Sequence, residues 1–158
     1  MSELSGLKFD DTLVAWKLQA SGAREVILHL AGLLQSAGHV APEYGEMAWQ
    51  RELHHPPGLP TRPFCIAFPH ADADGVIHSA LALASLEHDV NFKNMADPDE
   101  DLAVSLVIML ANNNPTEQVQ TLRNLAILFG EPEKLAALRD LSSPDAAAAW
   151  LTQELGLQ

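Results

Sequence analysis

The feature that most constrains the fold is a nearly continuous apolar run at residues 103–110. A strand that faces water on one side alternates apolar and polar residues, so a strand apolar at successive positions is buried on both faces. Shorter runs of the same kind occupy residues 64–68 and 80–86. We therefore expect a β-sheet that helices cover on each side.

Further strands and helices complete this pattern. Residues 12–18 alternate apolar and polar, which suits a half-buried strand, and Val90 with Phe92 predicts a short edge strand. A helix is expected from Ser21, which could cap it, to Gly38, and a second from Pro42 to about Glu52.

The C-terminal third is expected to be helical. One helix follows Pro115 and Thr116 and ends at Gly130, with an apolar face, and a last helix runs over residues 143–156. Four prolines and a glycine make residues 54–63 an ordered loop. The apolar face of the helix expected between Pro115 and Gly130 comprises Val119, Leu122, Leu125, Ala126 and Phe129. The predicted fold class is an α/β sandwich, a mixed β-sheet flanked by helices on both faces.

The composition limits the classes of function. A chain of 158 residues suits one domain, so residues 1–158 are interpreted as a single domain. No apolar stretch approaches the ~20 residues of a membrane span, and Cys65 is the only cysteine, so we expect a soluble, cytoplasmic protein. The net charge of −12 argues against binding nucleic acid or anionic lipid and favours a basic protein partner, or serves solubility alone.

His70 is the leading candidate for chemistry. It follows the predicted buried strand at residues 64–68, at the kind of strand end where such sheets bind ligands. A neutral imidazole can accept a phosphoryl group near pH 7 without a separate base, and it releases the group readily. The simpler interpretation is a hydrogen-bonded loop residue.

Several sequence blocks, in order, resemble one family. Arg51-Glu52, a Pro/Gly loop and residues 66–70, which read Ile-Ala-Phe-Pro-His, resemble the RE, PTG and IAxPH blocks of the mannitol, fructose and galactitol IIA phosphocarriers. Residues 91–95, Asn-Phe-Lys-Asn-Met, resemble the galactitol-type members in particular.

This resemblance implies roles for three residues. His70 would be the phosphoryl acceptor, and Arg51 would hold the phosphate oxygens, unless it only complements the dipole of its helix. Gln118 stands where mannitol-type members carry a second histidine, so it offers an amide, and its place near a helix N-terminus would suit an anion. Pro57 replaces the threonine usual in the family, and the loop between Arg51 and His70 is longer than in mannitol-type members.

The resemblance also implies the partners. His70 would take the phosphoryl group from phosphorylated HPr and pass it to a cysteine of a IIB component, with no cofactor. The IIC membrane permease, which contacts the sugar, would be an indirect partner. The same family implies one alternative, a regulatory module of the nitrogen type that acts by binding proteins.

Other residues suggest a third function. His70, Asp72, Asp74 and His78 could be read as the metal cluster of a hydrolase, but alternate loop positions rarely converge on one ion, so no metal is expected. Cys65 lies in an apolar strand, where a thiol is usually inert. We interpret His54 and His55 as solvated loop residues.

Overall fold

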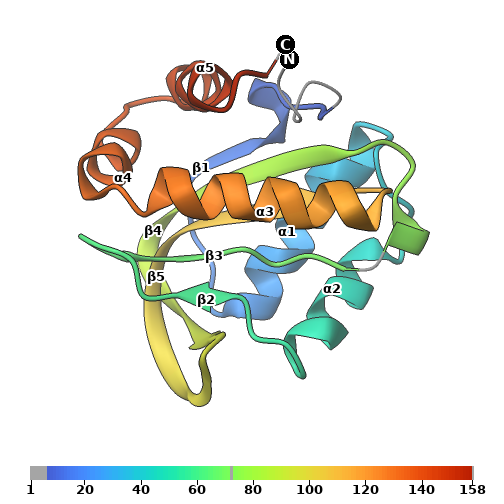
Figure 1. The fold of residues 1–158 in the computed structure, drawn as a ribbon, viewed down its shortest axis with the longest axis horizontal. Coiled ribbons are helices and arrows are strands. Elements are labelled where there is room, and N and C mark those ends of the chain that lie inside the picture. The colour runs from blue at the N-terminus through green and yellow to red at the C-terminus, as the bar shows by residue number, and fades with distance from the viewer. Residues whose placement is uncertain (1–6, 72, 158) are drawn as a thin grey trace.

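The computed structural model describes residues 7–71 and 73–157, which form a mixed sheet with helices around it (Figure 1). The strands are β1 (Val14–Leu18), β2 (Gly58–Leu59), β3 (Cys65–Ala67), β4 (Ala80–Asn94) and β5 (Asp97–Ala111). The helices are α1 (Ala23–Ser36), α2 (Tyr44–Glu52), α3 (Pro115–Phe129), α4 (Pro132–Arg139) and α5 (Pro144–Leu155), with short 3-10 turns η1 (Asp11–Leu13) and η2 (Ala73–Gly75).

The long antiparallel hairpin of β4 and β5 is the centre of the sheet. β1 pairs in parallel with β4, and β3 pairs in parallel with β5. β2 pairs antiparallel with β3 and meets the end of β4 at Asn94. The expected mixed α/β architecture is confirmed, with α1 packed on β4 and β5 and α3 across the opposite face (Figure 1).

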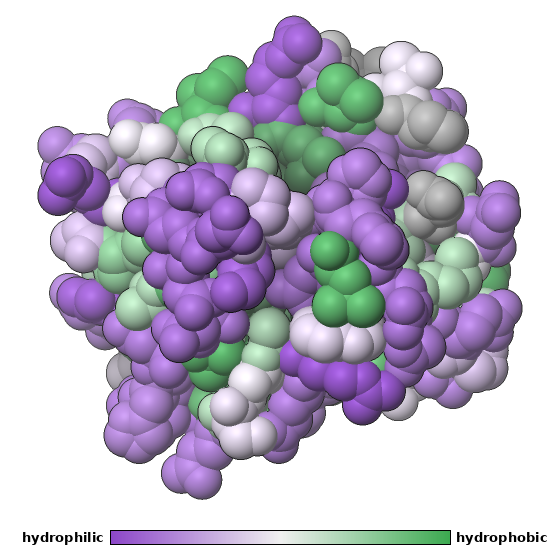
Figure 2. Space-filling model, turned by 90° about the horizontal axis from the view of Figure 1, so that it is seen from below, coloured by the Kyte–Doolittle hydropathy of each residue, from purple (hydrophilic) through white to green (hydrophobic). Residues whose placement is uncertain are grey.

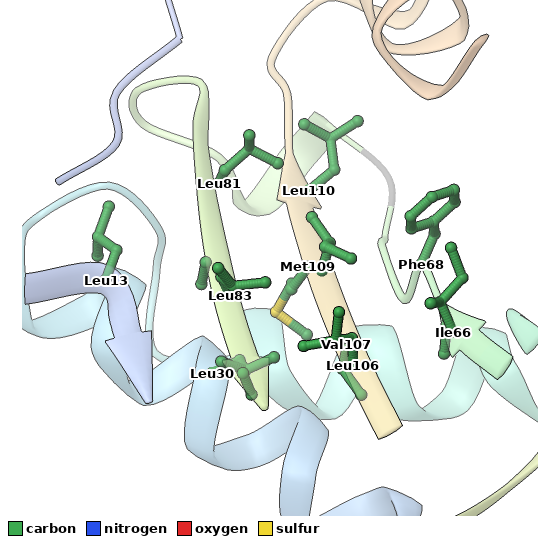
Figure 3. Packing of buried hydrophobic residues seen from close by; sticks show 14 of the residues in the cluster. Leu13, Leu30, Ile66, Phe68, Leu81, Leu83, Leu106, Val107, Met109 and Leu110 are labelled. Atoms are coloured by element: carbon green, nitrogen blue, oxygen red, sulfur yellow. The ribbon is translucent and has the colours of Figure 1, made fainter. Parts of the chain in front are cut away.

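The core lies where the sequence is continuously apolar. The central parts of β4 and β5 are buried, and Ile66 and Phe68 lie beside Val107 and Leu110 (Figure 3). Phe68 also meets Phe129 of α3, with ring centroids 6.2 Å apart. The segment that leads into His70 is therefore anchored in the core on both sides.

Several boundaries differ from the sequence-based prediction. Val90 and Phe92 do not form a separate edge strand, because β4 continues to Asn94 across a bulge between Ser85 and Val90. β5 begins at Asp97 rather than 103, since its acidic first residues pair with β4 in a ribbon that leaves the core. Residues 54–63 are not entirely loop, because β2 lies within them.

The helices differ from the sequence-based prediction in three respects. Gly22, not Ser21, is the N-cap of α1, and the Ser21 N–H and hydroxyl instead donate to the Glu25 carboxylate, which lowers the pKa of Glu25. The sequence-based prediction lacked α4, which buries Leu135 and Leu138. On α3, Val119 and Ala126 are exposed, so they do not belong to its buried face.

Candidate functional site

His70 lies three residues after the last residue of β3, at the end of the sheet where β5 also ends. It forms an isolated parallel bridge with Leu110, and the Leu110 N–H donates to the carbonyl of Pro69 at 3.3 Å. The imidazole is partly buried, and its Nδ1 lies 3.0 Å from the carbonyl oxygen of Phe68. A carbonyl only accepts, so Nδ1 carries the proton and Nε2 is the nucleophilic nitrogen of the neutral ring.

His70 borders a cavity of about 500 Å³ with mainly apolar walls. Phe68 and Leu122 form part of the wall, and Met95 and Pro98 at the tip of the β4–β5 hairpin form another part. His54 and His55 also line it, and both are exposed, as expected for loop residues. The cavity therefore places an imidazole among apolar residues and further histidines near the molecular surface.

The loop beneath His70 is held by backbone contacts. The Phe68 N–H donates to the carbonyl of Pro57 (3.0 Å), and the Met95 N–H donates to the carbonyl of Gly58 (2.9 Å). A Cβ at Gly58 would lie 2.5 Å from the Lys93 carbonyl oxygen, so only glycine fits there. Pro57 itself is buried, which gives it a structural place in this loop.

Tyr44 is a positioning residue that sequence reasoning missed. It is fully buried on α2, and its hydroxyl donates to the Leu110 carbonyl (2.8 Å) and accepts from the Ala71 N–H (3.1 Å). These bonds connect α2 to both segments that flank His70. The available signal was the buried helical position of a tyrosine, whose hydroxyl needs a partner when the ring is buried.

Tyr44→Phe is expected to destabilise the protein by about 2 kcal/mol, because it leaves a buried carbonyl and a buried N–H without their partner. Denaturant unfolding measures the loss. An unchanged midpoint and slope would show that this hydroxyl does not hold the His70 loop.

Arg51 borders a different cavity, beside the one that contains His70. That cavity is lined by Arg51, Glu46 and Ala71, and it shares His54 and His55 with the His70 cavity. Arg51 is also in the last turn of α2, where a cation complements the helix dipole. Both interpretations of Arg51 therefore stay open, and its contact with phosphate stays a prediction.

Gln118 lies in the first turn and a half of α3, but the backbone N–H groups there are already used. The Asn114 side chain accepts from the Thr116 and Glu117 N–H groups, and the Asn114 carbonyl accepts from the Gln118 N–H. An anion would therefore find no donor among these three amides. The side-chain amide of Gln118 is the remaining donor of this residue, but Gln118 is partly buried and lines neither the His70 cavity nor the Arg51 cavity, so its contact with a phosphoryl group stays a prediction.

The described residues give little support for a metal or thiol centre. Among residues 7–71 and 73–157, no three histidine, cysteine or acidic side chains could hold one ion, and Asp72 of the metal cluster considered above lies outside these residues. His39 and His78 form a pair, with their Nδ1 atoms 3.4 Å apart. Partial burial raises the pKa of the Cys65 thiol, as do Asp89 and Glu100, which disfavours a thiolate nucleophile.

Comparison with known proteins points in one direction. Residues 8–154 match the family described as "Phosphoenolpyruvate-dependent sugar phosphotransferase system, EIIA 2". The galactitol-specific EIIA component from Escherichia coli (strain K12) is 33% identical over 114 residues, covering 72% of this chain and 75% of that protein.

Solved structures share the fold. A IIA (PtxA) of the phosphotransferase system from Streptococcus mutans has a TM-score of 0.76 at 20% identity, covering 93% of this chain and 91% of that one. The Escherichia coli mannitol enzyme IIA, solved with phosphorylated enzyme IIB, has a TM-score of 0.75 at 21% identity, covering 95% and 98%. Nitrogen regulatory IIA-Ntr from Neisseria meningitidis has a TM-score of 0.70 at 22% identity, covering 90% and 94%.

Proposed function

The chain belongs to the EIIA 2 family of the phosphoenolpyruvate-dependent sugar phosphotransferase system, a family of phosphotransferases, and we propose that it carries the phosphoryl group on Nε2 of His70. The observation that carries this proposal is the Nδ1 contact with the Phe68 carbonyl, which leaves the lone pair of the ring on Nε2. The Nε2 lone pair attacks phosphorus while the bond from phosphorus to the donor's nitrogen breaks, and Nδ1 keeps its proton. In the second step the acceptor's thiolate attacks the same phosphorus, the Nε2–P bond breaks, and the imidazole returns to its neutral form.

The proposed donor is phosphorylated HPr, and the proposed acceptor is a cysteine of a IIB component, which serves a IIC permease. The complex of a mannitol enzyme IIA with a phosphorylated enzyme IIB supports the second partner for this fold. Catalysis consists of positioning and electrostatic support, and no cofactor enters the step. Within residues 7–71 and 73–157, no helix is long and apolar enough to cross a membrane.

A galactitol-like polyol is the proposed transported substrate, because the curated relatives at 33% identity are galactitol-specific. The alternative is a regulatory function by protein binding. The structural similarity to IIA-Ntr, at 22% identity, reflects the shared fold alone, whereas the galactitol-specific relatives are 33% identical, so the transport function takes precedence.

The labelled product tests the proposal directly. Incubation with phosphoenolpyruvate, enzyme I and HPr is expected to add one phosphoryl group to the wild-type chain. A phosphohistidine is destroyed by acid and survives alkali, whereas phosphoserine does the reverse. Absence of an acid-labile label with any HPr offered would refute the phosphocarrier function.

The surface around His70 favours a basic partner. Apolar Met95 and Pro98 line the cavity, and exposed Asp97 and Asp99 lie beside them on the same hairpin. The face that carries this hairpin tip and the end of α2 is mostly hydrophilic, with apolar residues in separate spots (Figure 2). Apolar contact ringed by carboxylates is the arrangement that a basic rim would complement.

Salt is therefore expected to slow the encounter. Raising the ionic strength from about 0.01 M to 1 M shortens the screening length from roughly 30 Å to 3 Å, so the second-order rate of phosphoryl uptake should fall. Quench-flow or stopped-flow experiments at each ionic strength measure this rate. A rate that does not change with salt would contradict the electrostatic part of this proposal.

Arg51→Ala and Gln118→Ala are expected to slow transfer without unfolding the protein, because both side chains are assigned to charge stabilisation. We expect a loss of about tenfold or more for Arg51→Ala and a smaller loss for Gln118→Ala. Arg62→Ala is the matched control, since Arg62 is exposed and lines neither cavity. Wild-type rates would reduce Arg51 to a helix-terminal cation.

A further inference from the structure

Glu52, the last residue of α2, is a buried carboxylate without a counter-charge. It is 7% exposed, and its Oε2 has no hydrogen-bond partner among the described residues. Burial raises the pKa of Glu52 to about 7, so the carboxyl group is largely ionised only above neutral pH. A buried polar atom without a partner is rare in a folded protein and calls for a physical explanation.

Glu52 lines a cavity of about 270 Å³ between α2 and the outer part of the β4–β5 hairpin. The aromatic residues Trp49 and Phe92 are among those that line it. Lys93 and Asp101 are the other charged residues on the cavity, and the Lys93 Nζ is bound to the Asp101 carboxylate at 2.8 Å, with both side chains about half exposed. The basic residue that lines the cavity, Lys93, is thus already paired with Asp101 and not with Glu52.

The chemistry of this cavity selects a cation with an apolar stem. A carboxyl group and two aromatic residues on one cavity favour a guanidinium or ammonium group, which pairs with an acid and is attracted to aromatic rings. The volume suits a single long side chain rather than a larger ligand, since ligand pockets usually exceed about 300 Å³.

The cavity adjoins the His70 site. Pro56 and Pro98 line both cavities, so a protein docked over His70 also reaches the mouth of the Glu52 cavity. The chain has a net charge of −12, and the hairpin between the two cavities carries exposed acidic residues. Both observations favour a basic protein as the occupant.

We propose that the Glu52 cavity receives an arginine or lysine side chain of the basic protein that delivers the phosphoryl group to His70. This inference rests on the proposed function. The partner's cation pairs with the charge of Glu52, so the buried acid contributes to partner affinity. In the isolated protein the same buried acid lowers the free energy of unfolding.

Steady-state uptake from phosphorylated HPr at pH 8 tests the proposal. Glu52→Gln is expected to raise KM at least tenfold and leave kcat unchanged, because Glu52 touches the partner and not the reacting atoms. Glu87→Gln is the matched control. Glu87 is exposed and lines neither cavity, and its substitution removes the same charge. Its KM should stay within twofold of wild type.

A second measurement uses the wild-type protein and does not depend on the folding of a variant. Ethylguanidinium chloride is expected to inhibit uptake competitively against phosphorylated HPr, beyond the effect of equimolar sodium chloride, and to lose this extra inhibition in Glu52→Gln. Equal KM for Glu52→Gln and Glu87→Gln overturns the proposal, as does inhibition no stronger than that by sodium chloride. Inhibition without a KM difference assigns the cavity to a free small cation and also overturns it. Absence of any labelling refutes the proposed function instead.

Discussion

Replacing His70 with alanine is expected to abolish phosphoryl uptake completely while the protein still folds. The side chain is only partly buried, and its Nδ1 contacts a carbonyl in the same loop, that of Phe68. The loop is held mainly by backbone contacts and by the Tyr44 hydroxyl. We therefore expect a stability change within about 1 kcal/mol but a loss of all acid-labile label.

The other histidines near the site are internal controls for this variant. His54 and His55 line the same cavity, and His78 pairs with His39, yet replacing any of these three should leave labelling intact. Labelling is followed with radioactive phosphoenolpyruvate, enzyme I and HPr. Acid-labile label on His70→Ala would assign the phosphoryl group to another residue and would bring forward the protein-binding alternative.

The architecture was predictable because burial is encoded in continuous apolar sequence. The run around Val107 and Ile108 indicated a strand covered on both faces, and β5 has that environment. The boundaries of a strand were less predictable where the strand extends into solvent and its side chains are not buried. The acidic first residues of β5 pair only because the hairpin continues beyond the core, so hydrophobic periodicity carries no signal for them.

The candidate site was predictable only in part. His70 was identifiable because it follows a buried strand and stands in a recognisable block. Tyr44 acts through the carbonyl of Leu110, which is 66 positions away, and such a contact depends on tertiary packing. The burial of Glu52 likewise depends on how α2 meets the hairpin, so a residue read only as part of a motif proved to be an unpaired buried acid.

Glu52→Gln is expected to stabilise the protein at pH 8 by about 2 kcal/mol more than at pH 4.5. Burial raises the pKa of Glu52 from 4.5 to about 7, which corresponds to about 3 kcal/mol at 1.36 kcal/mol per pKa unit. Relaxation of the folded protein around the buried charge lowers this to about 2 kcal/mol.

Proton linkage determines whether stability rises or falls with pH. The folded state binds the proton of Glu52 more tightly than the unfolded state, so wild-type stability falls as pH rises from about 4.5 to about 7. Above that range the full penalty applies, because folding then buries a charge without a partner. Below about pH 4.5 the carboxyl group is mainly neutral in both the folded and the unfolded state, and glutamine resembles this neutral form.

Denaturant unfolding of the wild type and Glu52→Gln at several pH values measures the difference, in which the titration of the other carboxyl groups cancels. Glu87→Gln should show no comparable trend, because Glu87 is exposed. A difference between the wild type and Glu52→Gln that does not vary with pH would mean that Glu52 has an ordinary pKa, and hence that its carboxylate is solvated or paired in solution. A stabilised Glu52→Gln would show that the unpaired acid is not required for folding, and the KM of this variant for phosphorylated HPr then decides whether the buried acid serves contact with that partner.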